Sequence, residues 1–189
     1  MNNESFLKYD KYLTKLIGEE SKNNLYEELG GTDKVSNASF GMSKDSGCAY
    51  DGALIDLSLK IAEYGIKINE ILPQELQVEK SSIYKVALLQ HIAKVTMYKP
   101  NDNLWEVEKR GILYSFNNQG GVSLKCGELS ALLVLNCGIK LSEEEFEAIR
   151  IIDKTKEENY NNGKYYYCAL SNIIRQANEL VTIEYRNKK

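Results

Sequence analysis

Residues 85–95 read KVALLQHIAKV, and this stretch decides how the rest of the chain is interpreted. Its apolar residues recur at the spacing of one helix face, so we expect a helix that is buried on that side. Ser81 or Ser82 is placed to cap the start of this helix. The segment also carries Gln90 and His91, the only histidine of the chain. A single imidazole in such a segment is more often a hydrogen-bonded core or surface residue than a metal ligand.

The composition is that of an ordinary globular domain. The chain has 189 residues, of which 43% are apolar, which is enough for one domain with its own core. The formal net charge of -3 argues against nonspecific binding to nucleic acid, because that binding depends on Lys and Arg. No apolar run approaches the roughly 18 residues of a membrane span, and the N-terminus lacks a signal-peptide pattern. We therefore expect a cytoplasmic protein with no membrane partner.

The cysteines give no sign of a metal site or of disulfides. They are Cys48, Cys126, Cys137 and Cys168, and no two of them form a C-x-x-C pair. A zinc site built from thiolates is therefore not expected. In a reducing cytosol the four side chains are expected to be free thiols.

The remaining pattern predicts a mainly α single domain spanning residues 1–189, with about six helices and a small β-hairpin. Besides the segment around 85–95, helices are expected over residues 5–29, 52–72 and 127–138, after Ser142, and from about residue 165 to residue 185. Ser142 and Glu145 form a capping-box pattern at one of these helix starts. Residues 31–51 are expected to form a long loop, residues 104–116 a hairpin that turns at Arg110-Gly111, and residues 154–164 a polar linker.

Five separated segments resemble the HD-domain phosphohydrolases, in particular the short phage and bacterial HD proteins, in their order and approximate spacing. The segments are YDGALIDLSL at 50–59, LLQHIAK at 88–94, KCGELS at 125–130, EEEFEAIRIID at 143–153 and RQANEL at 175–180. The resemblance covers roughly residues 35–185, with residues 1–30 as an additional N-terminal helix. It implies an HD-like helical domain, and a location in the cytoplasm of a bacterial cell or a phage-infected host.

The chain departs from the family where the family binds its divalent metals. The residues at these positions are Leu57, Gln90, His91, Cys126, Ile152 and Asn178, with Gly47 and Cys48 near the place of a loop histidine. Metals that activate water need several converging imidazole and carboxylate ligands, which one histidine cannot supply. We therefore expect no metal, no cofactor and no catalytic residue. Two alternatives stay open: a Cys126–His91 nucleophile and base, and a magnesium site made of carboxylates from among Asp51, Asp56, Glu128 and Asp153.

Several polar residues at matching positions remain as candidates for ligand binding. Lys94 and Arg150 are suited to holding a phosphate, and Gly127 at a helix start leaves backbone N–H groups free for an anion. Tyr50 or Tyr166 could stack on a base. The predicted ligand-binding residues are Tyr50, Asp56, His91, Lys94, Glu128, Ser130 and Arg150. The competing interpretation is that Lys94 complements a helix dipole and that Arg150 forms a salt bridge to Glu145 or Glu147, or to an acid elsewhere.

Three functions follow from this pattern. The first is a catalytically inactive HD-like protein that binds and sequesters a nucleotide or another phosphorylated small molecule; by analogy with the family's setting, a phage protein of this kind would trap a host immune signal. The second is a protein–protein interaction or inhibitor module, acting on a host protein or as a homo-oligomer. Its surface would be the 31–51 loop, the hairpin around Trp105 or the last helix. The third is a residual metal-dependent phosphohydrolase.

Overall fold

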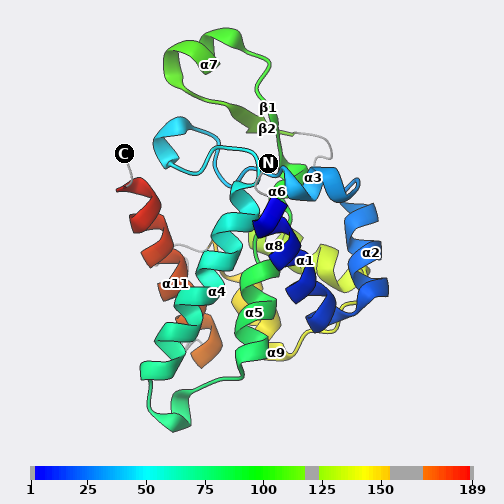
Figure 1. Cartoon of the computed structure of the whole chain (residues 1–189), viewed down its shortest axis with the longest axis vertical. Coiled ribbons are helices and arrows are strands. Elements are labelled where there is room, and N and C mark those ends of the chain that lie inside the picture. Colours follow the sequence, from blue (N-terminus) through cyan, green and yellow to red (C-terminus); the bar gives the residue numbers. More distant parts are fainter. Residues whose placement is uncertain (1–2, 118–123, 154–167, 188–189) are drawn as a thin grey trace.

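The computed structural model describes residues 3–117, 124–153 and 168–187, and over these ranges the fold is mainly α with one two-stranded antiparallel hairpin, as predicted (Figure 1). The helices are α1 (Asn3–Ile17), α2 (Glu19–Glu28), α3 (Thr32–Ser36), α4 (Ala53–Ile71), α5 (Lys80–Leu89), α6 (Lys94–Met97), α7 (Leu104–Arg110), α8 (Cys126–Asn136), α9 (Glu143–Arg150) and α11 (Ala169–Arg186). The strands are β1 (Tyr98–Pro100) and β2 (Tyr114–Phe116), and two 3-10 turns are η1 (Lys44–Ser46) and η2 (Gln74–Leu76).

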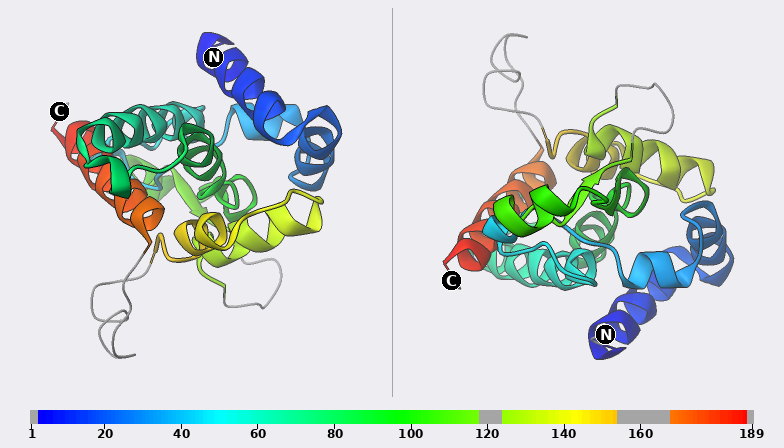
Figure 2. Two further views of the ribbon diagram at one scale, coloured as in Figure 1. Left: turned by 90° about the horizontal axis from the view of Figure 1, so that it is seen from below. Right: turned by 90° about the horizontal axis from the view of Figure 1, so that it is seen from above.

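The core is built around α5, which contacts α1, α4, α8, α9 and α11. Figures 1 and 2 show α4 and α11 running along each other, with α5 beside them. The apolar face predicted for residues 85–95 is buried, and Ala87 and Leu88 are buried as well. This wider burial follows from the number of helices that contact α5, because they cover more than one side of its C-terminal half.

The single helix predicted over residues 5–29 is wrong, because the chain turns at Gly18. Gly18 has a φ of 82°, a backbone conformation that side chains with a Cβ rarely adopt. The turn lets α2 fold back towards α1, where Lys22 reaches Asp10 at 3.1 Å. The predicted loop over residues 31–51 also contains the short helix α3 and the turn η1.

The helix that contains the opening stretch is shorter than predicted. Its N-cap is Glu79 rather than Ser81 or Ser82, and it ends at Leu89. The N–H of Ile92 then donates to the carbonyl of Leu89, a tight three-residue spacing that breaks the helical ladder. Gln90 and His91 therefore lie in the turn between α5 and α6 and not within a helix.

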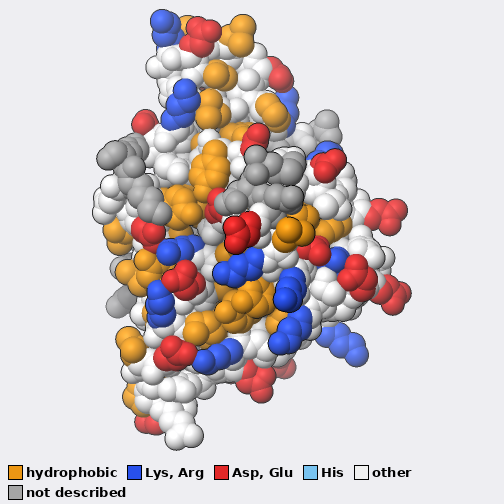
Figure 3. Space-filling model, in the orientation of Figure 1, with side chains coloured by type: hydrophobic (Ala, Val, Ile, Leu, Met, Phe, Trp, Pro, Cys, Tyr) orange, Lys and Arg blue, Asp and Glu red, His pale blue; other side chains and the backbone are white. Residues whose placement is uncertain are grey.

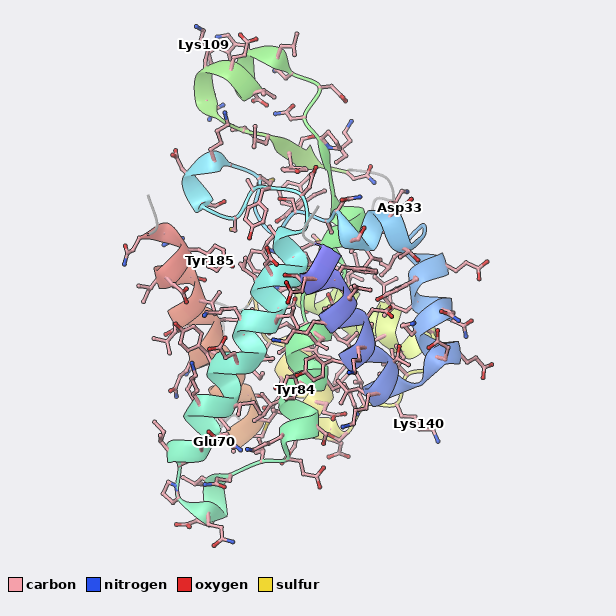
Figure 4. The ribbon with its side chains drawn as sticks, in the orientation of Figure 1. Asp33, Glu70, Tyr84, Lys109, Lys140 and Tyr185 are labelled. Carbon is pink, nitrogen blue, oxygen red and sulfur yellow. The ribbon has the colours of Figure 1, made fainter. Side chains whose placement is uncertain are left out.

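The predicted hairpin exists, but its position was wrong. Lys99 of β1 pairs with Ser115 of β2, while residues 104–110 form the helix α7 between the two strands. We call residues 98–116 the arm. The arm lies at one end of the long axis of the molecule (Figure 1), and Figure 4 shows Lys109 at its tip, at the opposite end from Glu70.

The predicted capping box at the start of α9 is confirmed, and it does more than start a helix. Ser142 Oγ accepts from the N–H of Glu145, whose carboxylate bonds back to the N–H of Ser142. The buried Glu145 carboxylate also accepts from Ser82 and from Lys85 on α5, both at 2.8 Å. Burial raises the pKa of Glu145, but these hydrogen bonds outweigh it, so that the pKa lies below its ordinary value.

The start of α8 packs closely against the end of α9. A Cβ on Gly127 would overlap the carbonyl oxygen of Ile149 and lie 2.9 Å from the Ile152 side chain. Glycine is therefore required here for the two helices to approach. The predicted linker over residues 154–164, together with Tyr166, lies outside the described residues.

Candidate functional site

Four positions that the resemblance aligns with metal ligands meet at one point in the fold. His91 Nε2 lies 3.2 Å from Asn178 Oδ1, and Asn178 Nδ2 donates to Gln90 Oε1 at 3.1 Å. Cys126 Sγ lies 3.9 Å from His91 Nδ1. Gln90 and His91 come from the α5–α6 turn, Cys126 from α8 and Asn178 from α11. We call these four residues the polar cluster.

Three of the four residues of the polar cluster are buried, and Asn178 is partly buried. Gln90, His91 and Cys126 are 0%, 5% and 7% exposed. Leu57 is buried in the hydrophobic core, and Ile152 packs against that core. Gln90 Nε2 has no hydrogen-bond partner among the described residues. The positions that the resemblance aligns with metal ligands are therefore filled by side chains that mostly bond to one another or pack in the core.

Burial keeps the polar cluster neutral. It lowers the pKa of His91 to about 3, assisted by the charge of Lys94 and opposed by the bond to Asn178. Burial likewise raises the pKa of Cys126 to about 12. A nucleophilic cysteine needs a thiolate, so these shifts oppose the alternative in which Cys126 attacks and His91 acts as its base.

The cluster does not fit the metal centre that the resemblance would imply. Both ring nitrogens of His91 already face side-chain partners, Asn178 and Cys126. Throughout residues 3–117, 124–153 and 168–187, no group of three or more His, Cys, Asp and Glu side chains is placed to hold a metal ion. The described residues therefore do not offer a metal site of the kind that the resemblance would imply.

The carboxylates of the magnesium alternative are each occupied in a different way. Asp51 accepts from Tyr114 at 2.6 Å, and Asp153 accepts from the N–H of Gly127 at 2.7 Å. Glu128 accepts from the N–H of Lys125 at 3.2 Å, as expected near the start of a helix. These hydrogen bonds indicate that the three carboxylates stabilise the local structure around them.

A groove of about 1300 Å³ lies between α3, α6 and the base of the arm. This volume exceeds the roughly 300–1,000 Å³ of typical small-molecule pockets. Its walls include Leu29, Asp33, Lys34, Asn37, Ser39, Lys94, Thr96, Met97, Tyr98, Lys99, Tyr114, Phe116, Asn117 and Leu129. Figure 4 shows Asp33 on α3, where this helix approaches the base of the arm. The groove thus combines aromatic rings, amide and hydroxyl groups, three lysines and three acids, the last being Glu28, Asp33 and Asp51.

Lys94 joins the groove to the polar cluster. Its Nζ donates to the carbonyl oxygen of Phe40 at 2.8 Å and lies 3.7 Å from the centre of the Phe40 ring and 5.6 Å from that of Tyr98. The Phe40 ring in turn meets the His91 ring edge-on, with centres 4.8 Å apart. Burial lowers the pKa of Lys94, and the charges of nearby groups only partly offset this effect.

Lys94 differs from other shielded lysines of the described residues, because its ammonium group has no carboxylate beside it. Lys22 and Lys85 lie 3.1 and 2.8 Å from carboxylate oxygens of Asp10 and Glu145. By contrast, no carboxylate oxygen in the described part of the chain lies within 4.0 Å of Lys94 Nζ. A shielded cation is normally paired, so Lys94 is unusual among the shielded lysines, although the wider groove lining also includes the acids Glu28, Asp33 and Asp51.

The other predicted ligand-binding residues lie elsewhere. Of the seven, all within the described ranges, Lys94 is the one that lines the groove. Tyr50 donates to Asp56 at 3.0 Å near the start of α4, and Ser130 Oγ accepts from the N–H of Ala93 inside the core. His91 belongs to the polar cluster, and Glu128 caps its own helix.

Arg150 lies at the end of α9 and acts on its own helix. Burial raises the pKa of Glu147, but hydrogen bonds from Ser171 and Cys168, together with the charge of Arg150, outweigh burial, so that the pKa lies below its ordinary value. No carboxylate oxygen is within 4.0 Å of the Arg150 side chain in the described ranges, so the predicted salt bridges to Glu145 and Glu147 are absent there. Arg150 is not part of the groove.

Sequence reasoning missed the aromatic residues that line the groove, Tyr98 and Phe116 among them, and Phe40, which contacts Lys94. Phe40 lies in a segment without periodicity, and Tyr98 and Phe116 belong to strands of three residues each, too short to show alternation. The available signal was the cluster of aromatic residues on both sides of α7. No sequence pattern pairs Tyr98 with Phe116, whose rings lie 5.5 Å apart.

Comparisons with known proteins leave the family unassigned: no family model, no curated protein and no solved structure matches the chain. The HD resemblance therefore rests on the sequence segments alone. Within the described residues, no helix is both long enough and apolar enough to cross a membrane.

Proposed function

We propose that this chain is a non-catalytic HD-like domain that binds and sequesters a nucleotide-type or other phosphorylated small molecule in the groove. The observation that carries the proposal is the shielded ammonium group of Lys94, which lines the groove with no carboxylate of the described residues within 4.0 Å. A phosphate would supply the missing negative charge, and Lys holds phosphate as a point charge.

The other walls favour a ligand that also has an aromatic ring. Tyr98 and Phe116 meet edge-on, and Tyr114 lies on the same side of the groove. Bases stack well on such rings, while Thr96 and Asn117 offer hydroxyl and amide groups to a sugar or a base edge. A nucleotide combines these features with phosphate.

Sequestration rather than turnover is supported by the state of the polar cluster. Its imidazole and thiol are buried, face each other and are shifted towards their neutral forms. The idea that a phage protein of this kind removes a host signalling nucleotide rests on the resemblance to the family and its setting.

A retention experiment tests the proposal. The purified protein is incubated with nucleotides and cyclic dinucleotides, separated from free ligand, denatured by heat, and the released compounds are identified by mass spectrometry. We expect one intact compound at about one per chain, lost in Lys94→Met and kept in Lys109→Met, a matched change at the exposed tip of the arm. Equal retention by Lys94→Met and wild type, or release of a converted compound, would contradict the proposal.

A protein–protein function is the second candidate, and the arm favours it. Leu104 and Trp105 at the start of α7 are 73% and 60% exposed, and Figure 3 shows apolar side chains among charged ones on the arm. Exposed Trp is common at binding hot spots. This function predicts that a Leu104→Ser/Trp105→Ser variant no longer binds its protein partner while its ligand retention stays unchanged. Lys94→Met should lose ligand retention and keep the binding to the protein partner.

A further inference from the structure

We infer that Lys94 is a nucleophilic amine that forms a reversible imine with carbonyl compounds that carry a phosphate group. This inference rests on the proposed function, because it uses the same groove and narrows the class of ligand. The geometry points to Lys94 because its Nζ is shielded, lines an open groove and lies between the rings of Phe40 and Tyr98.

The contacts of Nζ orient the amine without tying it to an acid. The bond to the Phe40 carbonyl uses one N–H and fixes the end of a flexible side chain at 2.8 Å. A carboxylate would hold the proton on nitrogen, as Glu145 does for Lys85 at 2.8 Å. For Lys94 no such carboxylate lies within 4.0 Å among the described residues. The amine is therefore held in place and is free to lose its proton.

A neutral amine is the reactive form, and the surroundings of Lys94 favour it. Burial disfavours the ammonium group and lowers its pKa, a recognised way of activating lysine towards carbonyl groups. Each unit by which the pKa falls raises the fraction of neutral amine at pH 7 by about tenfold. Lys94 should therefore react well ahead of surface lysines.

Imine formation needs only the amine of Lys94, the carbonyl compound and water. The lone pair of Nζ attacks the carbonyl carbon, the carbonyl oxygen takes up a proton, and nitrogen gives up a proton to water in the groove. Loss of the resulting hydroxyl as water then forms the C=N bond. The protonated imine keeps a positive charge on nitrogen, so the phosphate of the same ligand remains attracted to the groove wall.

The test uses two probes that differ only in the carbonyl group: pyridoxal 5′-phosphate, an aldehyde, and pyridoxine 5′-phosphate, the corresponding alcohol. The full-length protein is incubated at pH 7 with less than one equivalent of the aldehyde, reduced with cyanoborohydride and mapped by peptide mass spectrometry. We expect Lys94 to carry the main adduct, ahead of every other lysine, because its lowered pKa gives it a larger neutral fraction. Lys85, whose amine is paired with Glu145, serves as an internal control.

The outcomes separate the inference from the proposed function. A selective Lys94 adduct, with tighter retention of the aldehyde than of the alcohol, supports the inference. Equal retention of both probes that is lost in Lys94→Met, without an adduct, overturns the imine and leaves the binding function standing. Adducts spread over many lysines, or neither retention nor adduct, also overturn it. Because the mapping uses the wild-type chain, it does not depend on whether a variant folds.

Discussion

Replacing each of two shielded lysines by methionine should have opposite consequences, because only one of them neutralises an acid. Lys94→Met removes a charge that has no carboxylate within 4.0 Å in the described ranges, whereas Lys85→Met removes the partner of Glu145 at 2.8 Å. Methionine preserves most of the side-chain length in both cases. Comparing the two variants therefore distinguishes a lysine that binds a ligand from a lysine that stabilises the fold.

The expected magnitudes follow from the contacts. Desolvating the Lys94 charge costs several kcal/mol, while its hydrogen bond to Phe40 and its ring contact return about 2 kcal/mol each. Lys94→Met should therefore leave the free energy of unfolding within about 1 kcal/mol of wild type or raise it. Lys85→Met leaves the Glu145 carboxylate, whose side chain is 4% exposed, without its cation and should cost about 3 kcal/mol.

Urea unfolding followed by circular dichroism at pH 7 measures both variants, and thermal unfolding provides a second readout. For a chain of this length, the loss in Lys85→Met corresponds to a fall in Tm of roughly 6–12 °C. Ligand retention should show the opposite order, with Lys85→Met close to wild type at a temperature where it is folded. If Lys94→Met lost as much stability as Lys85→Met, Lys94 would be a structural cation and the reasoning behind the groove would fail.

Four further predictions use the same structure. The ring of His91 should stay neutral down to pH 5 by NMR, and stability should fall as the pH drops from 6.5 towards about 3, because the unfolded chain takes up the proton first; a ring that titrates near pH 6.5 would contradict this. The lowered pKa of Glu145 contributes stability that is fully present above pH 4.5 and is lost as the pH falls through the pKa of Glu145 in the folded protein. The free energy of unfolding of Glu145→Gln, measured in urea, should therefore depend less on pH in this range than that of wild type. Gly127→Ala should lower the free energy of unfolding by about 1–3 kcal/mol, because its Cβ overlaps the Ile149 carbonyl; an unchanged urea midpoint would show that α8 and α9 can move apart. Retention of a phosphorylated ligand without a carbonyl group should weaken as the pH rises through the lowered pKa of Lys94, whereas Lys94→Arg should bind it independently of pH over the same range.

Local patterns predicted the helices wherever a strong start signal or a long apolar period was present. The capping box at Ser142 and Glu145 and the period over residues 52–72 both correspond to helices in the structure. Breaks were harder to predict: Gly18 and the turn at Gln90 and His91 interrupt segments whose apolar pattern continues. The pattern records which side is buried, and a turn that keeps the same side buried does not disturb it.

The composition of the candidate site could be anticipated, but its location could not. One histidine, with leucine and isoleucine at two aligned positions, already argued against a metal centre. The resemblance also predicts Lys94 as a phosphate ligand, as one of seven candidate ligand-binding residues. The structure separates it from the other six, because it alone among them lines the groove.

The sequence by itself determined a mainly α chain with a single histidine and with a capping box at the start of α9, since these depend on residue type and local spacing. The tertiary structure alone decided that Lys94 lines a groove with no carboxylate of the described residues within 4.0 Å of its Nζ. That environment is made by Phe40, by the α5–α6 turn and by strands on either side of α7, segments separated by many residues. Whether a buried charge is paired depends on which distant side chains surround it, and no local pattern records that.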